Sequence, residues 1–218
     1  MPTLKFEKQL WDKGLPRVVG VDEVGMAALA GPVVAAACLV TPDTKLIRAV
    51  KDSKMLTRPQ REELATLIRT RVVRIGVGAA SVAEIHRLNI YHASHVAMTR
   101  ALRQIGEFDW VLVDGRRILD PAFAPGRHSE IVKGDTKSFA IAAASIIAKV
   151  TRDRLMASLA LKYPGYGWEH NAGYPTTDHR TALRERGLTV FHRHDFGTVK
   201  LMRAVENQLS LALAEPTT

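Results

Sequence analysis

Cysteine is nearly missing from this 218-residue chain, which has a single one, Cys38, inside an apolar run. One thiol permits no disulfide within the chain, which favours a reducing compartment, and we expect Cys38 to fill space in the core rather than act as a nucleophile. No apolar run approaches the ~20 residues that a transmembrane helix requires, and residues 1–10 lack the apolar core of a signal peptide. We therefore expect a cytoplasmic protein without a membrane anchor.

Internal repeats and low-complexity segments are absent as well. The chain is 46% hydrophobic and 24% charged, as is ordinary for a globular protein, and residues 1–218 fit a single domain with a full core. Acidic residues are outnumbered, with 22 Asp and Glu against 31 Lys and Arg, which gives a net charge of +9. Such an excess suits a polyanionic partner such as nucleic acid, although it is also compatible with simple solubility.

Two adjacent carboxylates, Asp22 and Glu23, end a β-branched run just before Gly25, and a second apolar run follows at residues 32–40. The pattern predicts a strand, an acidic turn and a second strand. Two anions at the end of a buried strand are costly to desolvate unless a cation meets them; a pair of surface acids on an edge strand is the alternative, and spacing leaves both open. Neighbouring side chains of a strand point to opposite faces, so both acids serve one site only where the strand ends or bends, as Gly25 allows.

Two further strand-like runs lead into a carboxylate next to a glycine. Residues 108–113 lead into Asp114-Gly115, and residues 130–132 lead into Lys133-Gly134-Asp135. Chance supplies one or two such endings, but three are harder to dismiss. The alternation of strands with helices predicts an α/β domain, and sites in open α/β sheets gather at strand ends. A carboxylate cluster on a basic protein suggests metal ions that act on a phosphodiester.

The helices are predicted from their caps and apolar periodicity. The expected elements are a helix from the capping box Thr57–Gln60 to about Thr70, a strand over 71–80, a helix from the Ser81 cap to Ile105 before Gly106, a long helix over about 136–163 with an alanine-rich first half, and a helix through Arg186.

Several polar residues near these elements are candidates for substrate contact. Lys51 and Lys54 precede the first long helix and are placed to hold backbone phosphates, although a solvated loop is the plainer interpretation. Ser145 and Lys149 lie one turn apart on one face of the alanine-rich helix. Asp153 follows one turn later, and we interpret it as an i, i+4 partner of Lys149 rather than a catalytic group.

The histidines and tyrosines have structural alternatives. His95 lies on the apolar stripe of its helix, which favours a core position over a ligand. His192 and His194 have a metal-ligand spacing but no nearby thiolate or third ligand, so a metal site is not favoured. The basic segment 180–203 lies beside the tyrosines of segment 163–174, which we expect to be exposed, and this combination suits a nucleic-acid groove.

Taken in chain order, these motifs resemble the signature of type 2 ribonucleases H over residues 17–200. The matching motifs are GVDEVG at 20–25 with GPVVAAA at 31–37, Asp52-Ser53-Lys54, Val113-Asp114-Gly115, Lys133-Gly134-Asp135, AAASIIAKV at 142–150 with Arg152-Asp153, and Gly173-Tyr174-Pro175-Thr176. The resemblance implies an RNase H-like fold, a central mixed sheet flanked by helices, with a catalytic core over about 17–160 and a C-terminal helical substrate-binding part over about 161–218. It also implies divalent-metal cleavage of the RNA strand in RNA–DNA hybrids.

Carried over position by position, the family's four metal-binding carboxylates fall on Asp22, Glu23, Asp114 and Asp135. Their oxygen ligands suit two Mg²⁺ or Mn²⁺ ions. Tyr174 matches the tyrosine that the family places at the DNA sugar beside the RNA–DNA junction. The other expected substrate contacts are Gly25, Met26, Ala27, Lys54, Ser145 and Lys149.

The chain departs from the family pattern where the substrate is read. The family usually has glycine-arginine-glycine after the acid pair, whose backbone reads the ribose 2′-hydroxyl, whereas this chain has Gly25-Met26-Ala27 followed by Ala28. The second glycine is replaced by a residue with a Cβ, and the arginine's cation is missing. Ala172 and the segment 194–196 also differ from the usual residues. Cleavage chemistry is therefore better supported than strict recognition of a single embedded ribonucleotide.

The expected function is a metal-dependent endoribonuclease that removes primers or misincorporated ribonucleotides from DNA, acting as a monomer. One alternative is a hybrid-binding protein of the same fold that cuts poorly because of the altered turn. Another is a type 3-like specificity for runs of ribonucleotides, which we disfavour because the chain has no room for that group's additional N-terminal domain.

Overall fold

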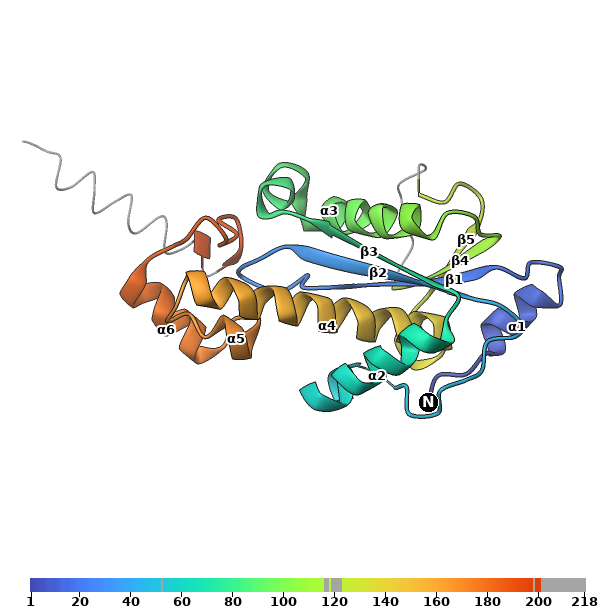
Figure 1. Ribbon diagram of the computed structural model, residues 1–218. Coiled ribbons are helices and arrows are strands. Elements are labelled where there is room, and N and C mark those ends of the chain that lie inside the picture. Colours follow the sequence, from blue (N-terminus) through green and yellow to red (C-terminus); the bar gives the residue numbers. More distant parts are fainter. Residues whose placement is uncertain (52, 116–117, 119–122, 198, 201–218) are drawn as a thin grey trace, which may run out of the picture.

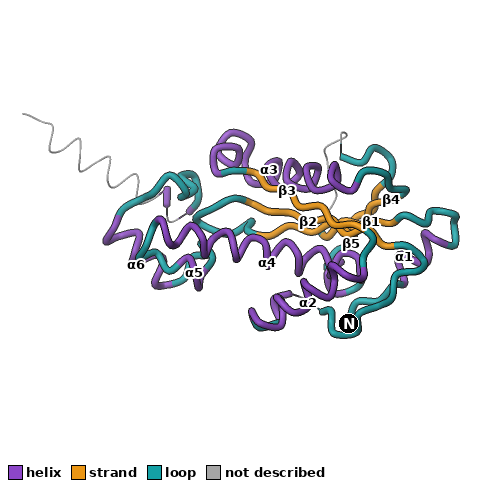
Figure 2. The backbone as a smooth tube through the Cα atoms, in the orientation of Figure 1, coloured by secondary structure: helices purple, strands orange, loops and turns teal. Residues whose placement is uncertain are grey.

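The computed structural model describes residues 1–51, 53–115, 118, 123–197 and 199–200. Within these residues a five-stranded mixed sheet has the strand order β3-β2-β1-β4-β5. Its strands are β1 (Val18–Val24), β2 (Val33–Val40), β3 (Arg74–Ala80), β4 (Trp110–Asp114) and β5 (His128–Ile131). β1 pairs antiparallel with β2 and parallel with β4. The strand that carries the acid pair is therefore the central strand of the sheet. Figure 2 shows the five strands together as one layer between helices.

Helices cover both faces of this sheet. The described helices are α1 (Lys5–Trp11), α2 (Arg58–Arg71), α3 (Val82–Ile105), α4 (Phe139–Lys162), α5 (Trp168–Asn171) and α6 (Thr177–Arg186), with short 3-10 turns at Ser53–Met55 and Gly134–Thr136. α4 and α2 lie over one face and α3 over the other, each on its own apolar cluster (Figure 1). α5 and α6 lie beyond the end of the sheet, beside the last turns of α4 (Figure 1). The predicted α/β architecture is confirmed.

The alanine-rich half of α4 brings this helix unusually close to β1. Every residue from Phe139 to Ala148 is buried. An added Cβ at Gly20 would lie only 2.1 Å from the carbonyl carbon of Ala140, so the strand and the helix pack with backbone against backbone. Close packing of this kind tolerates no added atom without a shift of the backbone. The small residues therefore set the distance between α4 and the strand that carries Asp22 and Glu23.

The predicted starts of α2 and α3 are confirmed. The Thr57 side chain accepts a hydrogen bond from the backbone N–H of Gln60, whose side chain caps Thr57 in return, and Ser81 forms the same kind of capping box with Glu84. α2 continues to Arg71, however, so the expected strand over 71–80 begins only at residue 74. The reason is that the helical hydrogen bonds of α2 run on until the chain turns at residues 72–73 toward β2.

The strand predicted over residues 130–132 is present as β5, but its bounds differ, since it covers His128–Ile131. β5 ends at Ile131, and Lys133 takes a left-handed φ of 56° before the 3-10 turn that contains Asp135. The helix expected from residue 136 starts later, because the Ser138 side chain caps it by accepting a hydrogen bond from the N–H of Ile141. Asp135 is thus placed by a turn between a strand and a helix cap.

The N-terminal helix α1 has no counterpart in the sequence prediction. It is anchored by Glu7, which is fully buried and accepts hydrogen bonds from Ser138 Oγ at 2.6 Å and from the N–H of Ala140 at 2.9 Å. Burial raises the pKa of Glu7, although these hydrogen bonds oppose the shift. An acceptor at the first turn of a helix is favourable because the N–H groups there have no partner within the helix. α1 therefore fastens the start of α4, which follows the turn that contains Asp135.

Cys38 and His95 occupy the core positions predicted for them, since both are buried. Burial raises the pKa of the Cys38 thiol to about 12, which keeps it protonated and unreactive at neutral pH. Among the helices in the described part of the chain, none combines the length and apolar character needed to cross a lipid bilayer.

Candidate active site

A pocket of about 390 Å³ lies at the end of β1. It is lined by Asp22, Glu23, Val24, Gly25, Met26, Ala27, Ser53, Lys54, Asp114, Ser145, Lys149 and Tyr174. These residues come from β1 and the turn after it, the loop before α2, the end of β4, the face of α4 and the segment before α6. The fold thus gathers the predicted site residues around a single pocket, except Asp135 and the candidate phosphate contact Lys51, which lines a different pocket.

Asp135 lies beside this pocket, where it pairs with Lys54 and where its neighbour Gly134 contacts Asp114. Lys54 Nζ is 3.9 Å from Asp135 Oδ2. The N–H of Gly134 donates a hydrogen bond of 2.6 Å to Asp114 Oδ1. Asp135 itself is only 6% exposed. The four predicted carboxylates, far apart in the sequence, therefore lie in one region of the molecule.

The end of β1 explains how two consecutive acids reach the same pocket. β1 continues through Asp22 and Glu23 to Val24, and Gly25 then starts a turn with a φ of 94°. The Asp22 side chain lies on the α4 side, where Ser145 opposes part of the rise in its pKa, and its Oδ1 accepts a hydrogen bond from the N–H of Glu23 at 2.8 Å. Because the strand ends directly beyond them, both acids line the pocket. The sequence predicted that both acids could serve one site only if the strand ended or bent beside them, and the strand ends there.

The carboxylates repel one another in a desolvated site. Burial raises the pKa of Asp22 well above its usual value, with further contributions from the charges of Glu23 and Asp114. Burial, followed by the charge of Asp114, raises the pKa of Glu23 to about 7. Like charges that are held together out of water favour protonation or a bound cation. The donor set consists of hard carboxylate oxygens, which fits Mg²⁺ or Mn²⁺.

Within the described residues, no three His, Cys, Asp or Glu side chains are grouped so that they could hold a metal ion as they stand. The residues fit a divalent cation by their chemistry and by their common pocket rather than as a finished ligand shell.

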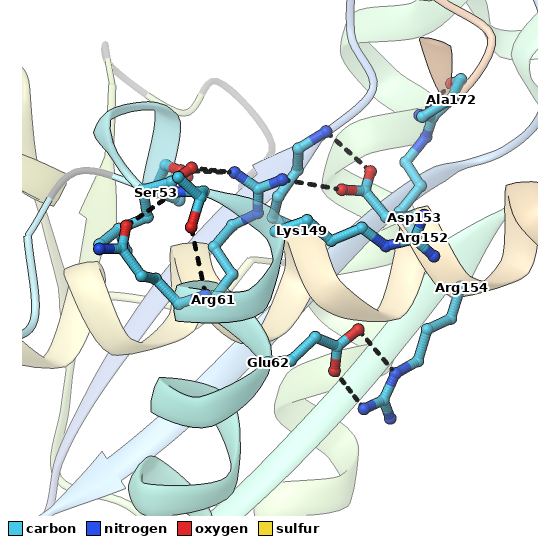
Figure 3. Close-up of polar contacts among 12 residues, drawn as sticks. Ser53, Arg61, Glu62, Lys149, Arg152, Asp153, Arg154 and Ala172 are labelled. Atoms are coloured by element: carbon cyan, nitrogen blue, oxygen red, sulfur yellow. Dashed lines mark hydrogen bonds and ion pairs between the residues drawn. The ribbon is translucent and has the colours of Figure 1, made fainter. Parts of the chain in front are cut away.

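A network of ion pairs fixes the cationic side of the pocket to α4 (Figure 3). Asp153, 12% exposed, lies between Lys149 Nζ at 2.7 Å and Arg61 Nη2 at 3.5 Å. Arg61 in turn donates to the carbonyl oxygens of Ser53 and Leu56, which hold the loop that carries the predicted phosphate contact. The predicted i, i+4 pair of Asp153 is confirmed, and the structure adds a second cationic partner that the sequence did not reveal.

We expect Asp153→Asn to lower kcat/KM about fivefold, mainly through KM. The substitution leaves two cations without their shared anion and frees Lys149 from its position in the pocket, and such a change of about 1 kcal/mol corresponds to that factor. Steady-state kinetics on an RNA–DNA hybrid tests it, with Asp178→Asn on the exposed face of α6 as the matched control. Equal KM values for the two variants would contradict a positioning role for Asp153.

Tyr174 is half-buried at the rim of the pocket. Lys149 Nζ lies 5.3 Å from the centre of its ring, and Arg152 Cζ lies 5.4 Å from it. Both distances fall in the range in which a cation is attracted to an aromatic face. The expectation that the neighbouring tyrosines are exposed is wrong for Tyr166, which packs against Trp168 in a third apolar cluster.

The pair His192 and His194 forms no metal site in the described part of the chain. His192 is buried, its Nε2 lies 3.2 Å from the Nε2 of His179, and burial lowers its pKa to about 3. The basic segment 180–203 was expected to face nucleic acid, but Arg193 is only 2% exposed. Its guanidinium donates to the carbonyl oxygens of Gly25 and Met26 at 2.7 and 3.2 Å, behind the turn that lines the pocket.

Known proteins share this fold. The structure is similar to that of ribonuclease H2 from Pyrococcus horikoshii, with a TM-score of 0.72 and 26% sequence identity over 89% of this chain and 99% of that one. It also has the fold of Bst-RNase HIII, solved in complex with Mn²⁺, with a TM-score of 0.67 and 22% identity over 95% of this chain and 75% of that one. The mixed sheet and its pocket of carboxylates therefore define a nuclease of the ribonuclease H class.

Comparisons of the amino-acid sequence identify one family within this class of nucleases. The ribonuclease HII family model matches residues 19–199, and the ribonuclease HII of Thermosynechococcus vestitus is 50% identical over 194 residues, which cover 89% of this chain and 90% of that protein. The chain belongs to the ribonuclease HII family. It is a metal-dependent endoribonuclease that acts on RNA–DNA hybrids, as the motifs predicted.

Proposed function

We propose that Asp22, Glu23, Asp114 and Asp135 hold the divalent metal ions, Mg²⁺ or Mn²⁺, with which this protein cleaves the RNA strand of a hybrid. The observation that carries the proposal is the pocket at the end of β1, where three of these acids meet and the fourth is tied to its rim. Bound in a pair, such ions supply an activated water and a stabilised leaving oxygen. Burial and neighbouring charges raise the pKa values of Asp22 and Glu23, so their ionised forms are costly in this pocket. A bound cation would stabilise those ionised forms.

The remaining pocket residues are proposed to position the substrate. Lys54 and Lys149 enter from different elements and supply positive charge for backbone phosphates. The ring of Tyr174, held near the cations of Lys149 and Arg152, offers an apolar face to the sugar beside the RNA–DNA junction. The turn over 25–27 supplies the contact to the 2′-hydroxyl, the group that distinguishes RNA from DNA.

At the level of the whole chain, we propose that residues 17–160 form the catalytic core and that residues 161–218 contribute to substrate binding. Residues 201–218 of that second part lie outside the described residues. The tyrosine-containing segment before α6 lines the pocket, which supports this division. The monomeric state, the cytoplasmic location and the role in removing primers or misincorporated ribonucleotides stay predictions.

A cleavage assay on two duplexes of one sequence tests the proposal. One duplex contains a run of four ribonucleotides and the other a single one. We expect Mg²⁺-dependent cleavage of both, abolished by EDTA, with the run cleaved faster because the Met26-Ala27 turn weakens reading of an isolated ribose. Binding of both duplexes without any cleavage in Mg²⁺ or Mn²⁺ would instead favour the hybrid-binding alternative, in which the protein recognises the hybrid but cuts it poorly.

A further inference from the structure

Two buried arginines lie behind the turn that lines the pocket. Arg152 of α4 is fully buried and Arg193 is 2% exposed. Within the described residues, neither forms an ion pair with a carboxylate, and their hydrogen-bond partners are backbone carbonyl oxygens. Burial, followed by the charge of Arg152, lowers the pKa of Arg193 to about 9. A cation without an anionic partner is expensive to bury, so the fold maintains an arrangement that costs stability.

The Arg193 side chain hydrogen-bonds to the turn. Its Nε donates to the carbonyl oxygen of Gly31 at 2.9 Å, and its Nη1 donates to those of Gly25 at 2.7 Å and Met26 at 3.2 Å. One guanidinium therefore joins the start and the end of the segment 25–31. The backbone supports this geometry, because the N–H of Arg193 donates to the carbonyl oxygen of Leu29 and residues 30 and 192 form a β-bridge.

The direction of these hydrogen bonds has a consequence for the other side of the turn. All peptide bonds in the described residues are trans, and the C=O and N–H of a trans peptide unit point in opposite directions. Since the carbonyls of Gly25 and Met26 point toward Arg193, the N–H groups of Met26 and Ala27 point away from it. Within the described part of the chain, neither N–H donates a hydrogen bond to another protein group, and both residues line the pocket.

We propose that Arg193 is a positioning residue for substrate discrimination: it holds the turn so that the N–H groups of Met26 and Ala27 are directed at the substrate ribose. This inference rests on the proposed function of the pocket. A guanidinium is suited to the task because its planar fork holds several acceptors in fixed directions, whereas an ammonium does not. The selectivity of this chain for ribose over deoxyribose thus depends on a side chain that never touches the substrate.

The test compares the binding of two duplexes of the same sequence, one with a single ribonucleotide and one entirely of DNA, in EDTA to prevent cleavage. We expect Arg193→Lys to reduce the preference for the ribonucleotide-containing duplex about fivefold, and Arg193→Met to reduce it further, with the affinity for the DNA duplex unchanged. Arg154→Lys, an exposed arginine of α4 that pairs with Glu62, is the matched control and should leave the preference intact.

A purely structural role for Arg193 would weaken the binding of both duplexes equally, and that result would overturn the proposal. If the unmodified protein itself shows no preference for the ribonucleotide, the proposed function of the turn fails instead. Where the variants do not fold, amide hydrogen exchange of the unmodified protein decides the question. The amides of Met26 and Ala27 should exchange at least threefold more slowly with the ribonucleotide-containing duplex than with the DNA duplex, and equal rates would refute the proposal.

Discussion

Asp22→Asn and Asp135→Asn should each reduce the rate of hybrid cleavage by at least about 10³-fold, equivalent to roughly 4 kcal/mol in the activation barrier. Each substitution preserves the size of the side chain but removes a negative charge and one oxygen ligand from the carboxylate set. Asp22 is 5% exposed and its Oδ1 accepts a hydrogen bond from the N–H of Glu23, a bond that the amide oxygen of asparagine can also accept. Steady-state cleavage in Mg²⁺ and in Mn²⁺ measures the loss.

The stability of the same variants provides an independent readout. Since burial and neighbouring charges raise the pKa of Asp22, its negative charge destabilises the metal-free fold at neutral pH. Asp22→Asn should therefore unfold at the same temperature as the unmodified protein or at a higher one, and Mn²⁺ should stabilise it less. Asp43→Asn, in an exposed loop, is the matched control. Full activity of Asp22→Asn or Asp135→Asn would contradict the assignment of the carboxylates.

The double variant Met26→Arg with Ala27→Gly should cleave a single embedded ribonucleotide about tenfold faster relative to a run of four, which corresponds to one additional hydrogen bond of about 1.4 kcal/mol. Removing the Cβ of Ala27 allows the backbone to approach the ribose more closely. Met26 is half-buried against the α3 side of the core. An arginine there can cover the same apolar surface with its stem while its charged end reaches the pocket.

The two single variants separate these contributions. If backbone approach dominates, Ala27→Gly alone should supply most of the gain, whereas a dominant cation would make Met26→Arg the more effective change. Competition between the two duplexes in one reaction gives the ratio of kcat/KM values directly. An unchanged ratio in the double variant would remove the explanation that the altered turn limits recognition of an isolated ribonucleotide.

Local signals in the sequence predicted much of this fold. The capping boxes at Thr57 and Ser81 mark helix starts because their partners lie three residues away. The alanine-rich stretch predicts a closely packed helix because small side chains let neighbouring backbones approach. α1 escaped prediction because its anchor, Glu7, bonds with Ser138 and Ala140, more than 130 residues later. Contacts over such distances leave no periodicity to detect.

The candidate site shows the same difference between what the sequence predicts and what it does not. The acids are visible in the sequence because each stands near a strand and a glycine; the pocket gathers three of them, and Asp135 lies beside it. The roles of Arg61 and Arg193 are not visible, because Arg193 bonds to backbone carbonyls that any residue provides, and Arg61 adds to such carbonyls a carboxylate 92 residues away, that of Asp153. Arg193 was counted within a basic segment facing nucleic acid, and only burial distinguishes a cation that supports a turn from one that meets a phosphate.

The β-bridge between residues 30 and 192 joins segments that are made far apart in time during synthesis. The turn beside the acids can therefore take its final position only late in translation. All four acids have left the ribosome once residue 135 has emerged, yet the guanidinium that closes the turn is translated 58 residues later, 168 positions after Gly25. Chains are made from the N-terminus at about 5–20 residues per second. On the proposal made for Arg193, a chain trimmed between the end of α4 at Lys162 and residue 193 would carry all four acids without the side chain that positions the turn.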